Sequence, residues 1–179
     1  MTAAVTTLKS RLPHEIRTAR LVLTTPTAAH APAIATLANN ENVHRWMARL
    51  PFPYGLSDAM DFIERFVPSE EECCFAILRD GELLGVVGLT FTPDQPPELG
   101  YWLGEPFWGQ GYATEAALAL VEAARAAGAT ALRSRALKDN AGSRNVLRKA
   151  GFVETHEALD AFGNCSGKLA VYMQLDLSR

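Results

Sequence analysis

A pair of glycines stands where the sequence changes from a strand-like to a helix-like pattern. Gly109 and Gly111 follow a strand-like segment, residues 97–103, and precede an alanine-rich segment that ends near Ala127. Glycine lets the backbone turn tightly and approach a ligand closely. The first N–H groups of the following helix have no partner within it and lie at the positive end of its dipole. The turn therefore predicts a binding site for a phosphate or pyrophosphate.

The familiar nucleotide-binding fingerprints do not fit this turn. The pattern G-x-G-x-x-G would need a third glycine where Thr114 stands, and no Gly-Lys-Ser/Thr of a P-loop follows. A strand-to-helix turn without any ligand would also explain a lone glycine pair. The turn alone does not decide the function.

A second segment downstream has the pattern of a short, well-capped helix. Asn140 suits the N-cap and Gly151 the position after the C-cap. Arg144, Arg148 and Lys149 give the helix a basic face, and the last two are favourably placed in its final turn. A capped surface helix would account for all of these residues.

Together the two segments resemble the GCN5-related N-acetyltransferases, the GNAT superfamily. Its acetyl-CoA loop reads Gln/Arg-x-x-Gly-x-Gly/Ala; Gly111 and Ala113 match the last two fixed positions, and Trp108 departs from the first. The string YWLGEPFWGQGYATEA is similar to the RimJ and RimL ribosomal-protein N-terminal acetyltransferases, and NAGSRNVLRKAGF resembles the second cofactor motif, N-x-x-S-x-x-x-x-x-x-x-G-F. The resemblance covers roughly residues 14–177.

This resemblance implies that acetyl-CoA is the cosubstrate and that no metal takes part. The turn would hold the pyrophosphate, the preceding strand would hold the pantetheine arm, and an amine would attack the thioester directly. Cys73, Cys74 and Cys165 then need not be nucleophiles. The implied cofactor-binding residues are Tyr101, Trp102, Leu103, Gly109, Gln110, Gly111, Tyr112, Ala113, Thr114 and Asn140.

Direct transfer needs a base, because amines are mostly protonated at pH 7. Glu98 is the first candidate, since many relatives carry an acidic residue in the strand before the glycine loop. A solvated strand-edge glutamate is the simpler interpretation. Glu157 and Asp160 are the alternatives, because the RimL-like subgroup places an acidic base after Gly-Phe.

The leaving thiolate also needs a hydrogen-bond donor. Many relatives use a tyrosine seven residues after the motif asparagine, where this chain has Leu147. The RimL-like subgroup uses the motif serine instead, which corresponds to Ser143. A capping role for Ser143 is the alternative hypothesis.

Three functions remain open. The chain is expected to transfer acetyl from acetyl-CoA to a primary amine, such as a protein N-terminal α-amine. The acceptor could instead be a small molecule, such as an amino acid, a polyamine or a drug. A protein of another class, a catalytically silent acyl-CoA-binding sensor, is the third hypothesis. Acceptor specificity is expected to reside in segments 39–54 and 158–168, which resemble the subgroup least.

The expected fold is α/β (α+β): a single GNAT domain with a mixed, mostly antiparallel six- to seven-stranded sheet, flanking helices and a splay at the acetyl-CoA site. We expect the domain to span 14–177, after a flexible N-terminus at 1–13. Asp80-Gly81 predicts a hairpin. Strand patterns occur at 21–25, 74–78, 83–91, 98–103, 132–137, 152–157 and 169–177, and helical patterns at 28–39, 41–47, 57–66, 112–127 and 141–150.

Composition limits the other functional classes. The chain has 179 residues and is 48% hydrophobic, enough for one domain with a sizeable core. A net charge of −3 provides no basic footprint for nucleic acid, and no apolar run predicts a membrane span or signal peptide. Three cysteines, two of them adjacent, form neither a disulfide framework nor a zinc-binding spacing. We expect a cytoplasmic protein without metal, either a monomer or a homodimer.

Overall fold

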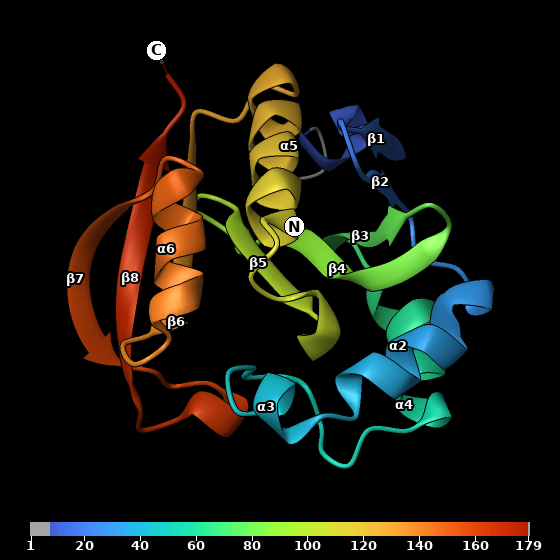
Figure 1. Cartoon of the computed structure of the whole chain (residues 1–179). Coiled ribbons are helices and arrows are strands. Elements are labelled where there is room, and N and C mark those ends of the chain that lie inside the picture. Colours follow the sequence, from blue (N-terminus) through green and yellow to red (C-terminus); the bar gives the residue numbers. More distant parts are fainter. Residues whose placement is uncertain (1–7, 179) are drawn as a thin grey trace.

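The computed structural model describes residues 8–178 and arranges eight strands in one mixed sheet (Figure 1). Their spatial order is β1-β2-β3-β4-β5-β6-β8-β7. Every neighbouring pair is antiparallel except β5 and β6, which are parallel. The strands are β1 Glu15–Arg17, β2 Val22–Thr24, β3 Glu72–Arg79, β4 Glu82–Thr90, β5 Glu98–Leu103, β6 Ala131–Leu137, β7 Val153–Leu159 and β8 Leu169–Asp176. The predicted mixed, mostly antiparallel sheet is confirmed.

Helices cover both faces of this sheet. Alternate residues of a strand point to opposite faces. Phe75 and Ile77 of β3 pack in the main core with α5 (Tyr112–Ala126), whereas Cys74 and Ala76 pack with α2 (Ala31–Ala38) and α4 (Leu56–Asp61). The helical elements are η1 Ala28–His30, α2 Ala31–Ala38, α3 Glu41–His44, α4 Leu56–Asp61, η2 Phe62–Phe66, η3 Glu105–Phe107, α5 Tyr112–Ala126, α6 Ala141–Lys149 and η4 Gly163–Cys165. Figure 1 shows α5 and α6 side by side, with α2, α3 and α4 gathered at the opposite end.

The hairpin between β3 and β4 forms where its turn residues predict it. Asp80 and Gly81 both have positive φ, 49° and 80°, as a tight two-residue hairpin turn requires. One extra residue in β4, Leu84, interrupts the register, because Ile77 pairs with Gly85 and Leu78 with Leu83. This β-bulge bends β4 beside the end of β5.

The two central strands part soon after they meet. The β5–β6 register consists of the single pair Glu98 and Arg133. One residue further along, the Ser134 hydroxyl donates to the Leu99 carbonyl at 2.7 Å, in place of continued strand pairing. The predicted splay is thus present, and it opens the sheet between β5 and β6.

The elements differ from the sequence-based prediction in three places. The sheet has eight strands rather than six or seven, because the short polar segment β1 pairs with β2. Helix α4 begins after Gly55 rather than Ser57, and Asp58 accepts the Gly55 N–H at 2.8 Å. Residues 8–11 are helical and Leu12 is buried in the main core, so packing extends N-terminally beyond residue 14.

Residues 1–7, the greater part of the segment expected to be flexible, lie outside the described residues. Within residues 8–178, no helix combines the length and apolar character that a membrane span needs.

Candidate active site

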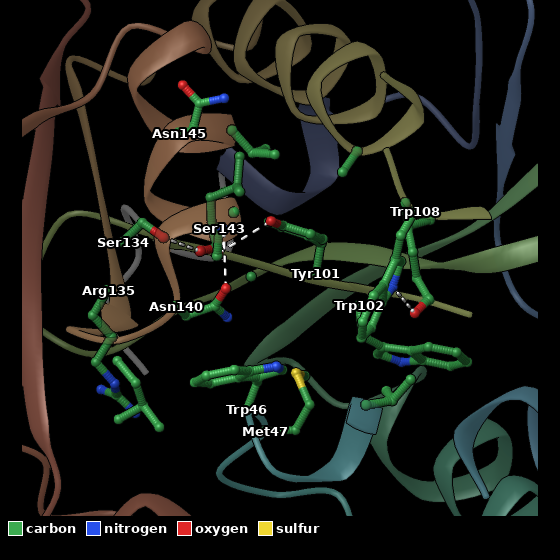
Figure 2. Close-up of a pocket in the computed structure, with 18 of the residues that line it drawn as sticks. Trp46, Met47, Tyr101, Trp102, Trp108, Ser134, Arg135, Asn140, Ser143 and Asn145 are labelled. Carbon is green, nitrogen blue, oxygen red and sulfur yellow. Dashed lines mark hydrogen bonds between the residues drawn. The ribbon is translucent and has the colours of Figure 1, made fainter. Parts of the chain in front are cut away.

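A cavity of about 620 Å³ occupies the gap between the splayed strands. Its walls come from β5, β6, the start of α5 and one side of α6, and its far end from the segments around Met47 and Asp160. Figure 2 shows Tyr101 and Ser143 directed toward each other across this space, with Trp46 and Met47 at one end. The cavity brings together motifs that are distant in the sequence.

The glycine turn forms one end of the cavity. Gly109 and Gly111 have φ of 73° and 83°, a conformation that strongly favours glycine. Gly111 is the N-cap of α5 and offers no side-chain cap, so the first amides of the helix remain available to a ligand. The lining residues of this end include Gly109, Gly111, Tyr112, Ala113 and Thr114.

Arg20 supports the turn from outside. It donates from Nη1 to the Gln110 carbonyl at 3.0 Å and from Nε to Glu115 Oε2 at 2.6 Å. Its guanidinium also lies 4.5 Å from the ring centroid of Tyr112. Gln110, predicted among the cofactor-binding residues, is absent from the cavity lining, and its side-chain amide donates to the Pro106 carbonyl at 3.1 Å.

The three predicted residues of β5, Tyr101, Trp102 and Leu103, all line the cavity. The indole of Trp108 donates to the Leu103 carbonyl at 2.9 Å. The residue that departs from the loop motif therefore connects the glycine turn to the end of β5.

Helix α6 contributes a capped serine to the opposite wall. Asn140 Oδ1 accepts the backbone N–H of Ser143 at 3.1 Å, which confirms Asn140 as the N-cap. The Tyr101 hydroxyl donates to Ser143 Oγ at 3.1 Å. Leu147 is only 1% exposed and belongs to the main core, so it presents nothing to the cavity.

Two of the three candidate carboxylates reach the cavity. Glu98 lies between two guanidinium groups, 3.3 Å from Arg133 Nε and 3.4 Å from Arg135 Nη1. Asp160 is 4% exposed and pairs with Arg135 Nε at 3.0 Å. Glu157 is outside the lining and pairs with Lys138 at 2.9 Å.

The cysteines lie in surroundings that suppress thiolate formation. Burial raises the pKa of Cys73 to about 11 and that of Cys74 to about 12. Burial also raises the pKa of Cys165, which lines the cavity, and the neighbouring Asp160 adds to the rise. Thiolates are the nucleophilic form of cysteine, so the site has no activated thiol.

Several lining residues were not predicted from the sequence. On α6, Gly142, Asn145, Val146 and Lys149 accompany Ser143 in the lining. Their spacing of three or four residues is the signal that could have revealed them, because such positions share a helix face. Thr90, Ser134 and Arg135, from the strands, are further examples of unpredicted lining residues. Trp46, Met47, Ala48 and Arg49 also line the cavity, and they belong to the segment 39–54 that is expected to determine acceptor specificity.

A rim of hydrogen bonds joins the two segments expected to determine acceptor specificity. The side-chain amide of Asn164 donates to the carbonyls of Met47 and Leu50 at 3.2 and 2.7 Å. The Asn164 N–H donates to the Ala48 carbonyl at 2.9 Å. The approach is so close that a Cβ on Gly163 would lie 1.9 Å from that carbonyl oxygen. These contacts hold the two segments together beside the cavity.

Residues 8–178 contain no group of three or more histidine, cysteine, aspartate or glutamate side chains suited to hold a metal ion. The cavity instead combines backbone amides, hydroxyls and two arginine-paired carboxylates. Such a set can bind an anion at one end and place polar groups around a reacting centre in the middle.

Comparison with known proteins agrees with this geometry. The family model described as acetyltransferase (GNAT) domain matches residues 20–153, and the chain belongs to this family. No curated protein sequence gives a significant match.

Solved structures share the fold at low sequence identity. RimL, the ribosomal L7/L12 alpha-N-protein acetyltransferase in complex with coenzyme A, is 18% identical, with a TM-score of 0.80 over 92% of this chain and 99% of that one. The microcin C7 self-immunity acetyltransferase MccE, in complex with acetyl-CoA and AMP, is 22% identical, with a TM-score of 0.82 over 93% and 98%. RimJ of Mycobacterium smegmatis, in complex with CoA-disulfide, is 18% identical, with a TM-score of 0.76 over 87% and 81%.

Proposed function

We propose that this protein is an N-acetyltransferase that moves the acetyl group of acetyl-CoA directly to a primary amine. One observation carries the proposal: a single cavity runs from the open helix N-terminus at Gly111, past the Ser143 hydroxyl, to the carboxylates of Glu98 and Asp160. An anion-binding end, a hydroxyl donor and acidic groups thus line one continuous space.

The residues present suit acetyl-CoA. The positive-φ turn at Gly109 and Gly111 places no Cβ in the way of a pyrophosphate, and Gly111 leaves the helix amides uncapped. The parting of β5 from β6 leaves β5 backbone groups for an extended pantetheine arm. When bound, acetyl-CoA would supply an activated acetyl thioester.

The chain's own residues would then accept the amine proton and stabilise the negative charge on the leaving sulfur. Transfer forms a C–N bond, breaks the C–S bond and removes a proton from the amine. Both oxygens of Glu98 face guanidinium groups, so we propose that the proton reaches this carboxylate through a water. Asp160, which shares Arg135 with Glu98, is the alternative acceptor of that proton. Ser143 would donate a hydrogen bond to the departing sulfur.

The proposed acceptor is a protein N-terminal α-amine. The support is the fold shared with RimL, an alpha-N-protein acetyltransferase, and the exposed Phe162 ring, over which the cavity-lining Arg135 lies at 4.7 Å. A small-molecule amine is the second candidate, supported by the hydrogen-bonded rim at Asn164, which limits the space at this end. A cytoplasmic monomer or homodimer completes the proposal, with a catalytic domain at 14–177 against whose core the preceding Leu12 packs.

The test uses the purified full chain with acetyl-CoA and a panel of amines. Free thiol release would be followed with peptides carrying different N-terminal residues, free amino acids, polyamines and aminoglycosides. Release with peptides supports the N-terminal assignment, and release with only one small amine would replace it. Binding of acetyl-CoA by calorimetry without release for any amine would indicate a silent sensor. Absence of both binding and release would contradict the proposal entirely.

A further inference from the structure

The side chains of Tyr101 and Ser143 contact each other across the cavity. Tyr101 belongs to β5 and Ser143 to the first turn of α6, and their side chains reach each other over the splay. Both residues line the cavity, and Figure 2 marks their hydrogen bond as a dashed line. Contact between two hydroxyls at this place is not required to hold either element, because β5 pairs with β4 and α6 has its own cap.

The environment of Tyr101 keeps its hydroxyl a hydrogen-bond donor. Burial raises the pKa of Tyr101, and the hydrogen bond with Ser143 offsets part of this rise. The phenol therefore remains protonated over the whole pH range in which an amine can be acetylated. A phenol is also a better donor than an aliphatic alcohol, so the direction from Tyr101 to Ser143 is the favourable one.

The contacts of Ser143 leave its hydroxyl hydrogen available to donate to another acceptor. Its backbone N–H is bound by Asn140, and its Oγ accepts from Tyr101. A serine hydroxyl that accepts a hydrogen bond keeps its own hydrogen for another acceptor. Within residues 8–178, the hydrogen bonds of Ser143 Oγ include no other side-chain partner than Tyr101. Because Ser143 accepts from Tyr101, the serine hydrogen points away from the phenol, and the cavity that Ser143 lines is open to it.

We propose that Tyr101 is a positioning residue that orients the Ser143 hydroxyl toward the sulfur of acetyl-CoA. Tyr101 would touch neither the sulfur nor the amine, and no proton would leave it. Its hydroxyl fixes the rotation of the serine O–H, so that this hydrogen meets the negative charge that develops on sulfur as the C–S bond breaks. This inference rests on the proposed function, since it needs a thioester at this point of the cavity.

A binding experiment separates this role from a merely structural one. Free CoA carries a titratable thiol, whereas acetyl-CoA does not, so the ratio of their dissociation constants isolates the sulfur. If Ser143 donates to the thiolate, CoA should gain affinity relative to acetyl-CoA as pH rises from 6 to 9. The measurement is calorimetric titration of both ligands over that range, and it needs no turnover.

In Tyr101→Phe the pH-dependent gain should shrink by about three- to tenfold, the range of one ordinary hydrogen bond. The kcat should fall by a similar factor, while the dissociation constant of acetyl-CoA changes little. Tyr172→Phe is the matched control, because Tyr172 lies in β8 outside the cavity lining and stacks on His156. It should leave the binding ratio and kcat at wild-type values.

Ser143→Ala is the second variant, and it keeps the N-cap contact because Asn140 binds the backbone N–H. It should abolish the pH-dependent preference for CoA and lower kcat by roughly tenfold to a thousandfold. Adding Tyr101→Phe to Ser143→Ala should change neither quantity further, since the tyrosine acts through the serine.

A folded Tyr101→Phe protein with the wild-type CoA preference and kcat would overturn the inference. It would also be overturned if Tyr101→Phe lowered kcat by the same factor in wild type and in Ser143→Ala. If Tyr101→Phe does not fold, retention of the CoA preference in Ser143→Ala would overturn it. If the wild-type protein binds acetyl-CoA and turns over while Tyr101→Phe has no effect, the role of Tyr101 is overturned and the proposed function stands. Wild-type protein that binds neither ligand would contradict both.

Discussion

Glu98 and Arg135 form an ion pair across the point where β5 and β6 separate, with 3.4 Å between Oε1 and Nη1. Arg135 also pairs with Asp160 at 3.0 Å. One guanidinium thus joins the two carboxylates that reach the cavity. A change at either carboxylate alters the surroundings of the other, so each must be replaced separately before a base is assigned.

Replacing Glu98 by glutamine should lower kcat/KM across pH 6–9. The carboxylate is proposed to draw the amine proton, and glutamine has no basic oxygen of comparable strength. General-base removal typically costs a hundredfold or more in kcat/KM. The measurement is thiol release over pH 6–9 with an amine chosen from the panel.

Glu157→Gln is the matched control, because Glu157 pairs with Lys138 outside the cavity lining and its loss should leave kcat/KM unchanged. An unaltered kcat/KM in Glu98→Gln would reject Glu98 as the base. The same loss of kcat/KM in Asp160→Asn, and not in Glu98→Gln, would move the assignment to Asp160, which is nearly fully buried.

Local backbone requirements made part of the site predictable. Gly109 and Gly111 adopt positive φ, and Asn140 caps α6 through its side chain. Each of these tasks favours a few residue types, so the residues could be identified from their neighbours alone. The splay of the sheet has no such local signature, and its prediction depended on the resemblance of two motifs to a family.

Residues that act through distant contacts could not be predicted. Asn164 binds the carbonyls of Met47 and Leu50, more than a hundred positions earlier in the chain. Arg135 reads in the sequence as an ordinary polar residue of an alternating strand, and only the fold places it between Glu98 and Asp160. The three-residue strand β1 could not be predicted, because Glu15 and Arg17 give it no apolar pattern.

Replacing Gly111 by valine should weaken acetyl-CoA binding. Gly111 has φ of 83°, which a β-branched residue tolerates poorly, so the substitution should distort the turn that presents the first amides of α5 to the pyrophosphate. A Cβ there would also come within 3.3 Å of Arg20, which supports the turn. The expected loss is on the order of 1–3 kcal/mol, measured by calorimetry.

Gly81→Val separates the two causes, because Gly81 has φ of 80° and a Cβ there would meet nothing within 4 Å. It introduces the same backbone strain in a hairpin turn that is not part of the cavity lining. We expect lower thermal stability with unchanged acetyl-CoA affinity. Equal affinity in folded Gly111→Val would show that the turn does not bind the cofactor.

The cysteines should prove dispensable for transfer. With the pKa of Cys73 at about 11 and that of Cys74 at about 12, almost no thiolate exists at pH 8. The native protein should therefore react slowly with a thiol reagent and rapidly once unfolded. Alanine at Cys73, Cys74 and Cys165 together should keep kcat within about threefold of wild type, since these thiols are proposed to take no chemical part.

Detection of an acetylated cysteine by mass spectrometry after a single turnover would contradict direct transfer. Cys165 is the position to inspect first, because it lines the cavity. Stability of the triple variant should be followed by thermal melts, since Cys74 and Cys165 are buried and their replacement leaves small voids.

Glu115 should stabilise the fold in a pH-dependent way. Its carboxylate accepts hydrogen bonds from the Thr18 hydroxyl at 2.6 Å and from the backbone and side chain of Arg20 at 2.9 and 2.6 Å. Partial burial acts to raise the pKa of Glu115, but the hydrogen bonds from Thr18 and Arg20 outweigh it, and the pKa lies below its usual range. Folding therefore favours the ionised form.

The sign of the effect follows from this lowered pKa. The stabilisation is fully present above the pKa of an unfolded glutamate, about 4.3, and is lost as pH falls through the lower value of the folded state. Glu115→Gln should reduce the free energy of unfolding by about 1.5–3 kcal/mol at pH 7, the range for hydrogen bonds to a charged group. The difference from wild type should shrink steadily below about pH 4, as measured by denaturant titrations at each pH.

Glu122→Gln is the matched control on the same helix. Glu122 pairs with Arg125 but is 62% exposed, and such surface pairs contribute little. It should change stability by only a few tenths of a kcal/mol at any pH. Glu115→Gln should also weaken acetyl-CoA binding at pH 7, because Arg20 then loses the partner that holds it against Gln110. Unchanged stability across pH in Glu115→Gln, or an equal effect of Glu122→Gln, would show that this contact does not support the glycine turn.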